Sequence, residues 1–397
     1  MKKNYIMGVI ACAALTMTSC SNDEIGGNNT KQGDPIEFGV YLGRDAQGSR
    51  GTIITKDNLT KFGVSAYYNN DDFPEFMYNQ AVIKEGTAWT YSPVKYWPTM
   101  SYDHLNFFAY SPYSDDSNGL TKLSKNTEKG LPYVEVSLPE DGDLTKMVDF
   151  VAASPAMTAK IDVVKLEFKH EMTRISLQAK VSEDVFNAVG AANKTKVVIR
   201  SIKLNNGLNN GGEFYTKAKY KFHQGIIDSD WIGHVKAKSP IDIQSILNWS
   251  SDTWTISDKN VIDANSNKGI ALEGQNPVNL LKKTDSKQEY LFLIPSNNAD
   301  DKGKLVGLKA NSTSATITYD IITEDSNLED RYSKTSATKT VYLPAGIMQQ
   351  GKAYNLTFTI AVDQVKLDAK VADWDTATDS DSKIDVPYTP DDATPNP

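Results

Sequence analysis

Cysteine is nearly absent from this chain. Only two cysteines occur in 397 residues, Cys12 and Cys20, and both lie within the first twenty positions. No intramolecular disulfide and no thiolate metal site can therefore stabilise the part of the chain that follows. That part must fold on its hydrophobic core, and a hydrophobic content of 40% is ordinary for a folded protein.

Long apolar runs and an excess of positive charge are also lacking. Beyond residue 20, no apolar run reaches the ~18 residues that a membrane-spanning helix needs. Acidic residues number 50 against 42 basic ones, which gives a net charge of −8. The electrostatic field of such a protein repels phosphate polymers, so nucleic acid is not expected as a partner.

The local sequence signatures of catalysis are missing as well. The chain has no G-x-S-x-G elbow, no P-loop, no G-x-G-x-x-G and no H-E-x-x-H. Its histidines are few and do not stand at metal-ligand spacing from one another: His104, His170, His223 and His234. We therefore expect no enzyme activity, no metal site and no cofactor.

The first twenty residues are typical of a secretory signal. Lys2 and Lys3 precede an apolar stretch that is too short to cross a bilayer as a mature helix. The sequence L-T-M-T-S-C then resembles a bacterial lipobox, which predicts a signal peptide over residues 1–19 and lipidation of Cys20. Residues 20–34 read as a flexible tether. An ordinary cleaved signal with an incidental cysteine is the alternative.

Most of the chain beyond the tether predicts β-strands. Short alternating or β-branched runs recur from I-E-F-G-V-Y-L at 36–42 to Y-N-L-T-F-T-I-A-V at 354–362, separated by polar turns. Only residues 183–193 and 241–247 indicate helices. Many short strands at regular spacing favour an all-β fold of antiparallel β-sandwiches.

The order of the strands predicts two domains. A new series of strands begins after residue 160, so we expect an N-terminal β-sandwich over residues 35–160 and a C-terminal one over 161–388. A Pro-rich tail follows over residues 389–397.

An aromatic run lies in the expected N-terminal domain. The sequence W-T-Y-S-P-V-K-Y-W-P at 89–98 contains Trp89 and Trp97, whose rings could stack on sugars as glycan contacts. The competing interpretation, which we favour, is that these rings fill the thin core of a sandwich, because buried aromatic side chains supply much of the apolar burial of a small domain.

The same region resembles the fimbrillin family, the type-V pilins and fimbrillin-like surface lipoproteins of Gram-negative anaerobes. The resemblance is carried by F-M-Y-N-Q-A-V, G-T-A-W-T-Y-S-P-V-K-Y-W-P and L-N-F-F-A-Y-S-P-Y within 76–113. Further similar segments follow in order, among them V-D-F-V-A-A, L-E-F-K-H-E-M-T-R-I, Y-L-F-L-I-P, G-K-A-Y-N-L-T-F-T-I and V-A-D-W. It implies two tandem transthyretin-like β-sandwich domains that form part of a surface filament.

The resemblance also implies how the protein assembles. In polymerising members of the family, an arginine-specific protease removes the N-terminal segment, and a strand of the next subunit fills the groove left behind. Here residues 36–42 would be the removable strand, and Arg50 would be the processing site, with Arg44 as the second choice. The C-terminal K-I-D-V-P segment resembles the donor strand, although Pro387 limits its length.

These observations together predict a structural subunit of a fimbria, at the stalk or the tip, which contributes to cell adhesion. Its expected partners are other fimbrial subunits by strand addition, the outer membrane through the lipid on Cys20, and host or bacterial surface glycans or proteins. Residues 375–377 resemble an O-glycosylation acceptor at Thr376, and a plain linker is the competing interpretation. The alternative functions are a monomeric glycan-binding lipoprotein of a nutrient-uptake system and a hydrolase with dispersed carboxylates.

Overall fold

The computed structural model describes most of the chain between residues 33 and 374. The gaps in the description are 43–52, 101, 116–118, 140–146, 148, 156–158, 184–194, 207–211, 224–230, 238–240, 244–246, 248, 250–253, 257–258, 263–267, 273, 282, 285–286, 289, 302–304 and 362–363. Every named element within the described residues is a β-strand, which confirms the all-β prediction. No helix in this part of the chain is long and apolar enough to cross a bilayer.

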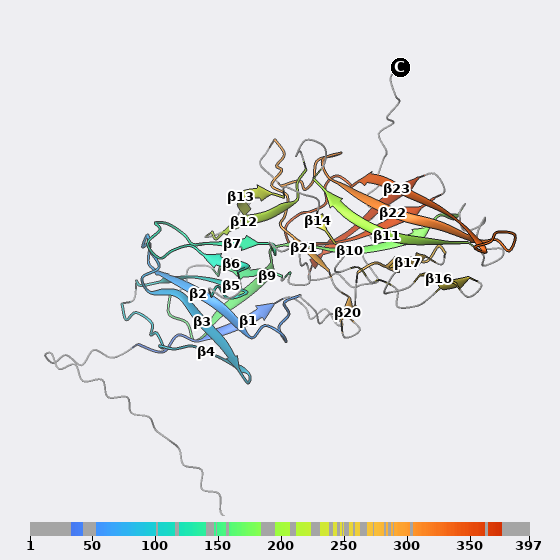
Figure 1. Ribbon diagram of the computed structural model, residues 1–397. Helices are drawn as coiled ribbons and strands as arrows, with labels where there is room; N and C mark the ends of the chain where they lie inside the picture. The colour runs from blue at the N-terminus through green and yellow to red at the C-terminus, as the bar shows by residue number, and fades with distance from the viewer. Residues whose placement is uncertain are drawn as a thin grey trace, which may run out of the picture.

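A seven-stranded sheet forms one end of the elongated molecule (Figure 1). Its strands lie in the order β1 (Phe38–Leu42), β9 (Val164–His170), β8 (Val151–Ala153), β5 (Leu105–Ser111), β2 (Lys61–Tyr68), β3 (Met77–Glu85) and β4 (Ala88–Thr90). A four-stranded sheet accompanies it: β13 (Trp231–Lys236), β12 (Tyr215–Lys221), β7 (Tyr133–Ser137) and β6 (Thr121–Leu123).

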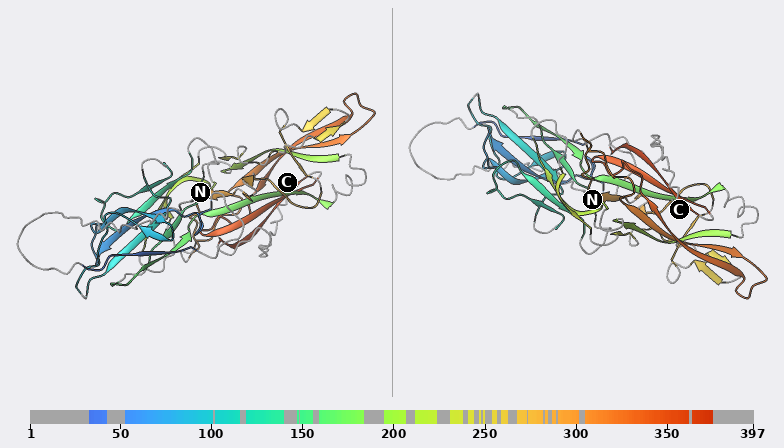
Figure 2. Two further views of the ribbon diagram at one scale, coloured as in Figure 1. Left: turned by 90° about the horizontal axis from the view of Figure 1, so that it is seen from below. Right: turned by 90° about the horizontal axis from the view of Figure 1, so that it is seen from above.

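Two further sheets form the other end of the molecule (Figure 2). One is built from β18 (Val278–Asn279), β10 (Thr173–Val181), β24 (Lys352–Ile360) and β25 (Val365–Asp373), with β21 (Leu291–Leu293) paired to β10. The other contains β14 (Ile241–Asp242), β11 (Thr195–Asn205), β22 (Ser314–Glu324) and β23 (Tyr332–Tyr342), with β17 (Ile270–Leu272) paired to β11. Two small hairpins complete the set: β15 (Trp254–Ile256) with β16 (Lys259–Ile262), and β19 (Lys283–Thr284) with β20 (Lys287–Gln288).

The seven-stranded sheet is buried on both faces, and strand β5 shows why. Successive side chains of a strand point to opposite faces. Phe107 and Ala109 join one hydrophobic cluster, whereas Phe108 and Tyr110 join a second cluster that continues into the rest of the molecule. Phe108 packs against Phe222, which follows β12, with ring centroids 5.5 Å apart. The four-stranded sheet therefore covers one face, and the other face has a separate core.

Two details differ from the sequence-based expectations. The pairs β1–β9 and β10–β24 are parallel, so the β-sandwich sheets are mixed and not purely antiparallel. The expected helix at 241–247 is wrong at its first two residues, which form β14, and Leu247 makes an isolated bridge with Leu281. Most of the other expected helix, at 183–193, lies outside the described residues.

The strand pairings cross the expected domain boundary at residue 160. Strand β9 lies beyond that position but pairs with β1 and β8, and β12 pairs with β7. The division into 35–160 and 161–388 stays a prediction, but the hydrogen-bonded sheets do not separate at residue 160.

Candidate strand-exchange site

Strand β1 lies at the edge of the seven-stranded sheet and has a single neighbour in it. It pairs in parallel with β9 in a register that runs from Phe38 opposite Val164 to Leu42 opposite Phe168. Just before β1, the amide of Val164 donates to the carbonyl of Glu37 at 2.8 Å. Without β1, the outer edge of β9 would present unpaired backbone donors and acceptors.

Alternate side chains of the β1 segment point into the core of the sheet. Ile36, Phe38 and Leu42 are at most 5% exposed, whereas Tyr41 is 56% exposed. Burial of a large apolar side chain contributes roughly 1.5–3 kcal/mol, so the three together contribute roughly 5–9 kcal/mol as an upper estimate. The alternation in I-E-F-G-V-Y-L thus produces one buried face, as a half-buried strand requires.

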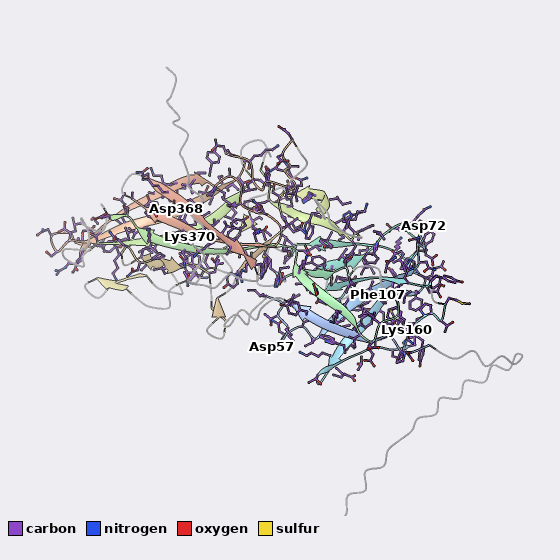
Figure 3. All side chains as sticks on the ribbon, turned by 180° about the vertical axis from the view of Figure 1, so that it is seen from behind. Asp57, Asp72, Phe107, Lys160, Asp368 and Lys370 are labelled. Atoms are coloured by element: carbon purple, nitrogen blue, oxygen red, sulfur yellow. The ribbon has the colours of Figure 1, made fainter. Side chains whose placement is uncertain are left out.

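The groove that receives this face is lined by aromatic rings. The ring of Phe38 lies 5.5 Å from that of Tyr91, 5.7 Å from that of Phe107 and 6.4 Å from that of Phe62. Figure 3 shows Phe107 among the dense side chains of this end of the molecule. Phe168 and Trp97 belong to the same cluster. The groove that holds the β1 segment is therefore apolar and suits a strand with large apolar side chains at alternate positions.

The residues before β1 are held by the loop that carries the aromatic run. The amide of Ile36 donates to the carbonyl of Lys95, and the amide of Trp97 donates to the carbonyl of Asp34, each at 2.9 Å. The hydroxyl of Tyr91 also donates to the carbonyl of Ile36 at 2.9 Å. The N-terminal segment 34–42 is thus hydrogen-bonded to the loop 91–97 at its start and to β9 over the rest of its length.

The chain that resumes at Ile53 is held by both hydrophobic clusters. Ile53 is 3% exposed and belongs to the cluster shared with the rest of the molecule, not to the β1 cluster. The amide of Ile54 donates to Asp149 Oδ2 at 3.0 Å. Asp149 is fully buried and lies 2.6 Å from His170 Nδ1. Ile54 and the buried Leu59 pack in the β1 cluster, so the chain after the gap at 43–52 contacts both clusters.

His170 ends β9 and touches the last described residue of the chain. Its ring stacks on that of Trp374, with centroids 4.6 Å apart and planes 8° from parallel. Trp374 in turn stacks on Phe292 at 5.6 Å. The stacking holds Trp374 between His170 and Phe292.

The structure places both tryptophans of the suggested glycan contact in the β1 cluster. Trp97 is 2% exposed and its ring lies 6.0 Å from that of Phe107. Trp89 is half-buried, with its ring 4.9 Å from that of Phe62. Trp97 presents no ring face to solvent, so the core interpretation is supported over the glycan interpretation for this residue.

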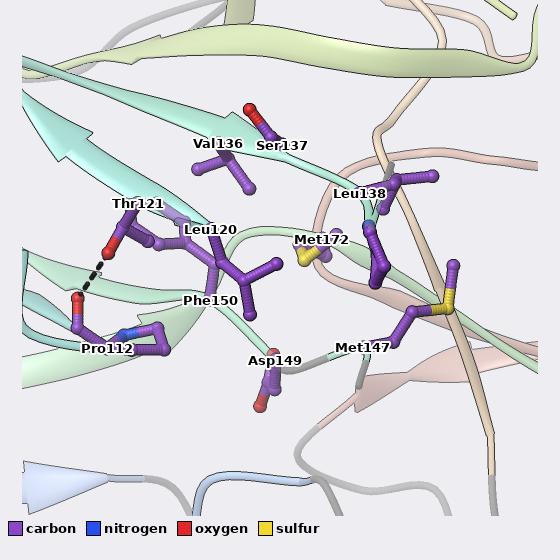
Figure 4. A pocket seen from close by; sticks show the side chains of 11 residues that line it. Pro112, Leu120, Thr121, Val136, Ser137, Leu138, Met147, Asp149, Phe150 and Met172 are labelled. Carbon is purple, nitrogen blue, oxygen red and sulfur yellow. Dashed lines mark hydrogen bonds between the residues drawn. The ribbon is translucent and has the colours of Figure 1, made fainter. Parts of the chain in front are cut away.

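The remaining predicted site residues lie outside the described residues: Cys20, Arg44, Arg50 and Thr376. Within the described part of the chain, no group of histidine, cysteine or acidic side chains is arranged to hold a metal ion. A partly enclosed pocket with a cavity volume of only about 10 Å³ lies beside Asp149, which is its only ionisable lining residue (Figure 4). Its lining combines apolar side chains, among them Met147 and Phe150, with Thr121, Ser137 and Asp149, and its volume is about that of one water molecule.

These features define an all-β sandwich protein whose N-terminal edge strand is deeply packed in its sheet. The sequence model of the fimbrillin-like family matches residues 49–374. Because this match covers most of the sequence, the chain belongs to that family.

Two known proteins show how far the likeness extends. Fimbrium subunit Fim1C of Phocaeicola vulgatus is 26% identical over 402 aligned residues, which cover 95% of this chain and 98% of that protein. A fimbrial protein from Bacteroides vulgatus with a crystal structure is 23% identical, with a TM-score of 0.67 over 86% of this chain and 99% of the other. The second likeness establishes that the two chains share a fold.

The site as a whole was not apparent from the sequence. The alternation at 36–42 and the aromatic run at 89–98 were both visible, but the sequence did not show that they pack on each other. One signal for this packing was available: the strand has one strongly apolar face, and the aromatic segment is of similar length. The sequence did not predict that Asp149 binds the amide of Ile54. A lone aspartate in V-D-F-V-A-A belongs to no local pattern that would indicate this contact.

Proposed function

We propose that this protein is a structural subunit of a cell-surface fimbria that assembles by donor-strand exchange and contributes to cell adhesion. The observation that carries the proposal is the β1 segment, an edge strand that fills an apolar groove and pairs with β9 alone in its sheet. Membership of the fimbrillin-like family and the likeness to a fimbrium subunit support it.

Release of β1 creates the acceptor. The edge of β9 then carries unpaired N–H and C=O groups, and the aromatic groove loses the side chains that filled it. A strand from a second subunit can pair with the backbone groups of β9 and fill the groove with alternate apolar side chains. Such an exchange links subunits without any new cofactor or covalent bond.

A cut between residues 42 and 53 separates the strand from the body. Arg50 is the proposed processing site, and Arg44 is the second choice; both lie in the segment between β1 and Ile53. After a cut at either position, Ile53 in the shared core and the hydrogen bond from Ile54 to Asp149 keep the body anchored. Only the segment that ends with β1 is free to leave.

The proposed donor is the C-terminal segment K-I-D-V-P at 383–387, which lies outside the described residues. Ile384 and Val386 alternate in the way that Ile36 and Phe38 do. In a strand with these side chains inward, Pro387 faces the backbone of β9 and lacks the N–H that would bond there. The donor would therefore bind through its side chains, with one backbone hydrogen bond fewer than β1.

We propose that a lipid on Cys20 attaches the unprocessed subunit to the outer membrane, and that residues 20–34 separate this anchor from the fold. O-glycosylation at Thr376 remains a prediction of the same kind. Glycan binding by a monomeric lipoprotein is the second function considered, and the burial of Trp97 weakens it.

The proposal is tested by processing and assembly in one experiment. Protein expressed from Ser21, which lacks both cysteines, is incubated with an arginine-specific protease and followed by intact mass and electron microscopy. We expect a product that begins at Gly51 and the growth of filaments. The variant Arg50→Ala should keep its full mass or shift the cut to Arg44. Trimmed protein that stays monomeric at high concentration would contradict the proposal.

A further inference from the structure

The four-stranded sheet of β6, β7, β12 and β13 has one basic face, although the whole chain carries a net charge of −8 (Figure 1). Its other face packs on the core through alternate residues such as Val134, Ala218 and Tyr220. Successive side chains of a strand point to opposite faces, so the residues between these face outward. The outward lysines, all exposed or half-buried, are Lys122 on β6 and Lys217, Lys219 and Lys221 on β12.

The lysines on β12 are not separated by acidic residues, as the lysines of two other strands are. The exposed positions of β25 hold Lys366, Asp368 and Lys370 in turn (Figure 3). On β9, Glu167 stands between two exposed lysines in the same way. The equivalent positions of β12 hold three lysines in succession. Side chains two residues apart on one face of a strand are ~7 Å apart, so these three cations repel one another.

One acidic residue lies on the basic face, and the strand register places it among the lysines. Glu135 of β7 is opposite Lys122 on one side and Lys219 on the other. Its Oε1 lies 3.2 Å from the Nζ of Lys217. Among the outward residues described on the four strands, it is the only acid. One carboxylate against four lysines leaves this face with a formal charge of +3. We call these five residues the lysine face.

Two side chains of the lysine face are already held in position. The Nζ of Lys219 lies 4.2 Å from the ring centre of Tyr133, which is on the neighbouring strand β7. Lys217 is held by its ion pair with Glu135. A lysine side chain loses rotamer freedom when a ligand fixes it, and that loss opposes binding. The contacts of Lys217 and Lys219 therefore reduce the entropic cost of binding an anion here.

The size and charge of the lysine face determine which anion it suits. With ~4.8 Å between strands and ~3.4 Å per residue, its lysines cover about 10 Å by 14 Å. This area accommodates a short stretch of one polymer chain. Double-stranded DNA carries one charge per ~1.7 Å on a stiff rod, which would continue over the acidic remainder of the protein. A flexible chain of sugars with spaced carboxylate or sulfate groups instead places its anions on the lysines, and its hydroxyl groups can donate to Glu135.

We propose that the lysine face is a binding site for an acidic polysaccharide. The lysines contact the carboxylate or sulfate groups, and Glu135 contacts the sugar hydroxyls between them. This inference goes beyond the proposed function, because the lysine face shares no residue with the strand-exchange site and needs no assembly. In a filament the face would recur once per subunit, so that one long polysaccharide could engage several copies at once and bind more tightly than to a single subunit.

The test measures the affinity of the chain expressed from Ser21 for sulfated heparin and for carboxylated polygalacturonate by titration calorimetry, with neutral dextran as the blank. We expect both acidic polysaccharides to bind, less tightly at higher salt, and dextran not to bind. The double variant Lys219→Gln with Lys221→Gln should bind about tenfold or more weakly, because two contacts to anions are lost. Glu135→Gln should bind about twofold to fivefold more tightly, because the only carboxylate of the face is removed.

The matched control is Lys366→Gln with Lys370→Gln, which changes the net charge equally on β25, in a sheet at the other end of the molecule. Its affinity should stay within about twofold of the wild type, because salt screens distant charges. All variants should keep the unfolding temperature of the wild type within a few degrees, since exposed ion pairs contribute little to stability.

Three results would overturn the inference. They are no binding of either acidic polysaccharide, an equal loss of affinity in both double variants, and tighter binding to phosphatidylserine vesicles or double-stranded DNA than to either polysaccharide. Protein that binds the polysaccharides as expected but forms no filaments after cleavage would contradict only the proposed function and would support this inference.

Discussion

Phe38 packs the first strand against the core of the seven-stranded sheet. Its ring contacts three aromatic rings from three other parts of the chain. Removal of the ring in Phe38→Ala should lower the free energy of unfolding of the unprocessed protein by about 3–5 kcal/mol. Urea denaturation, followed by circular dichroism, measures this loss.

The matched control for Phe38 is its neighbour Tyr41, which is 56% exposed. Tyr41→Ala should change the free energy of unfolding by no more than about 0.5 kcal/mol. After assembly, Phe38→Ala and Tyr41→Ala should have the same free energy of unfolding, because the proposed exchange removes β1 from the subunit. An equal loss in both variants before processing would show that β1 does not pack as described here.

Single residues also show what a sequence can predict about this protein. The alternation of Ile36, Phe38 and Leu42 was sufficient to predict a strand with one buried face, and the structure confirms it. The sequence alone did not determine whether Trp97 lies in the core or at the surface. An aromatic ring beside prolines suits both a sugar-binding surface and a core, and only its contact with Phe107 decides between them.

At the scale of elements, the parallel pairing of β1 with β9 is the feature on which the proposed function depends. Each strand is clear in the sequence, but their partnership joins segments far apart in the chain, which no local pattern encodes. The expected helix at 241–247 is wrong for a related reason. Its apolar spacing suits a helix, yet Ile241 pairs with Leu204 of β11 and Leu247 pairs with Leu281.

The release of β1 should be visible in tryptophan fluorescence. Trp97 is buried beneath the segment that leaves. Removal of the β1 fragment from cleaved protein by gel filtration in mild urea should expose Trp97 and shift the emission to longer wavelength. A synthetic peptide of residues 34–42 should reverse the shift.

Two controls isolate the groove in this measurement. The variant Trp97→Phe should lose most of the shift, and a peptide with Phe38→Asp should fail to reverse it, because a carboxylate cannot be buried unpaired among aromatic rings. A shift that persists in Trp97→Phe would place the change elsewhere in the molecule.

At the scale of the whole molecule, the strand pairings unite the chain across the expected boundary. Strand β9 carries β1 at its edge, and at its end His170 contacts Asp149 and Trp374. His170 thus contacts both Asp149, which binds the amide of Ile54, and the last described residue of the chain. Sequence patterns could locate the strands and the segments that resemble the family, but the contacts of His170 with Asp149 and Trp374 depend on tertiary packing.

The central claim is that β1 must leave before subunits join, and a reversible lock on β1 tests it most directly. Tyr41 and Glu167 are opposite each other in the β1–β9 register, and both are exposed. Directly paired positions on neighbouring strands are close enough for a disulfide. Protein expressed from Ser21 contains no other cysteine, so Tyr41→Cys with Glu167→Cys can form only this bond within one chain.

The measurement is filament growth of the cleaved double variant, with and without a reductant, counted by electron microscopy. We predict that the oxidised protein is cut but forms no filaments, and that reduction restores assembly to the level of the single variant Tyr41→Cys. Filaments that grow equally well while the disulfide is intact would contradict the account, because the groove would then still hold its own first strand.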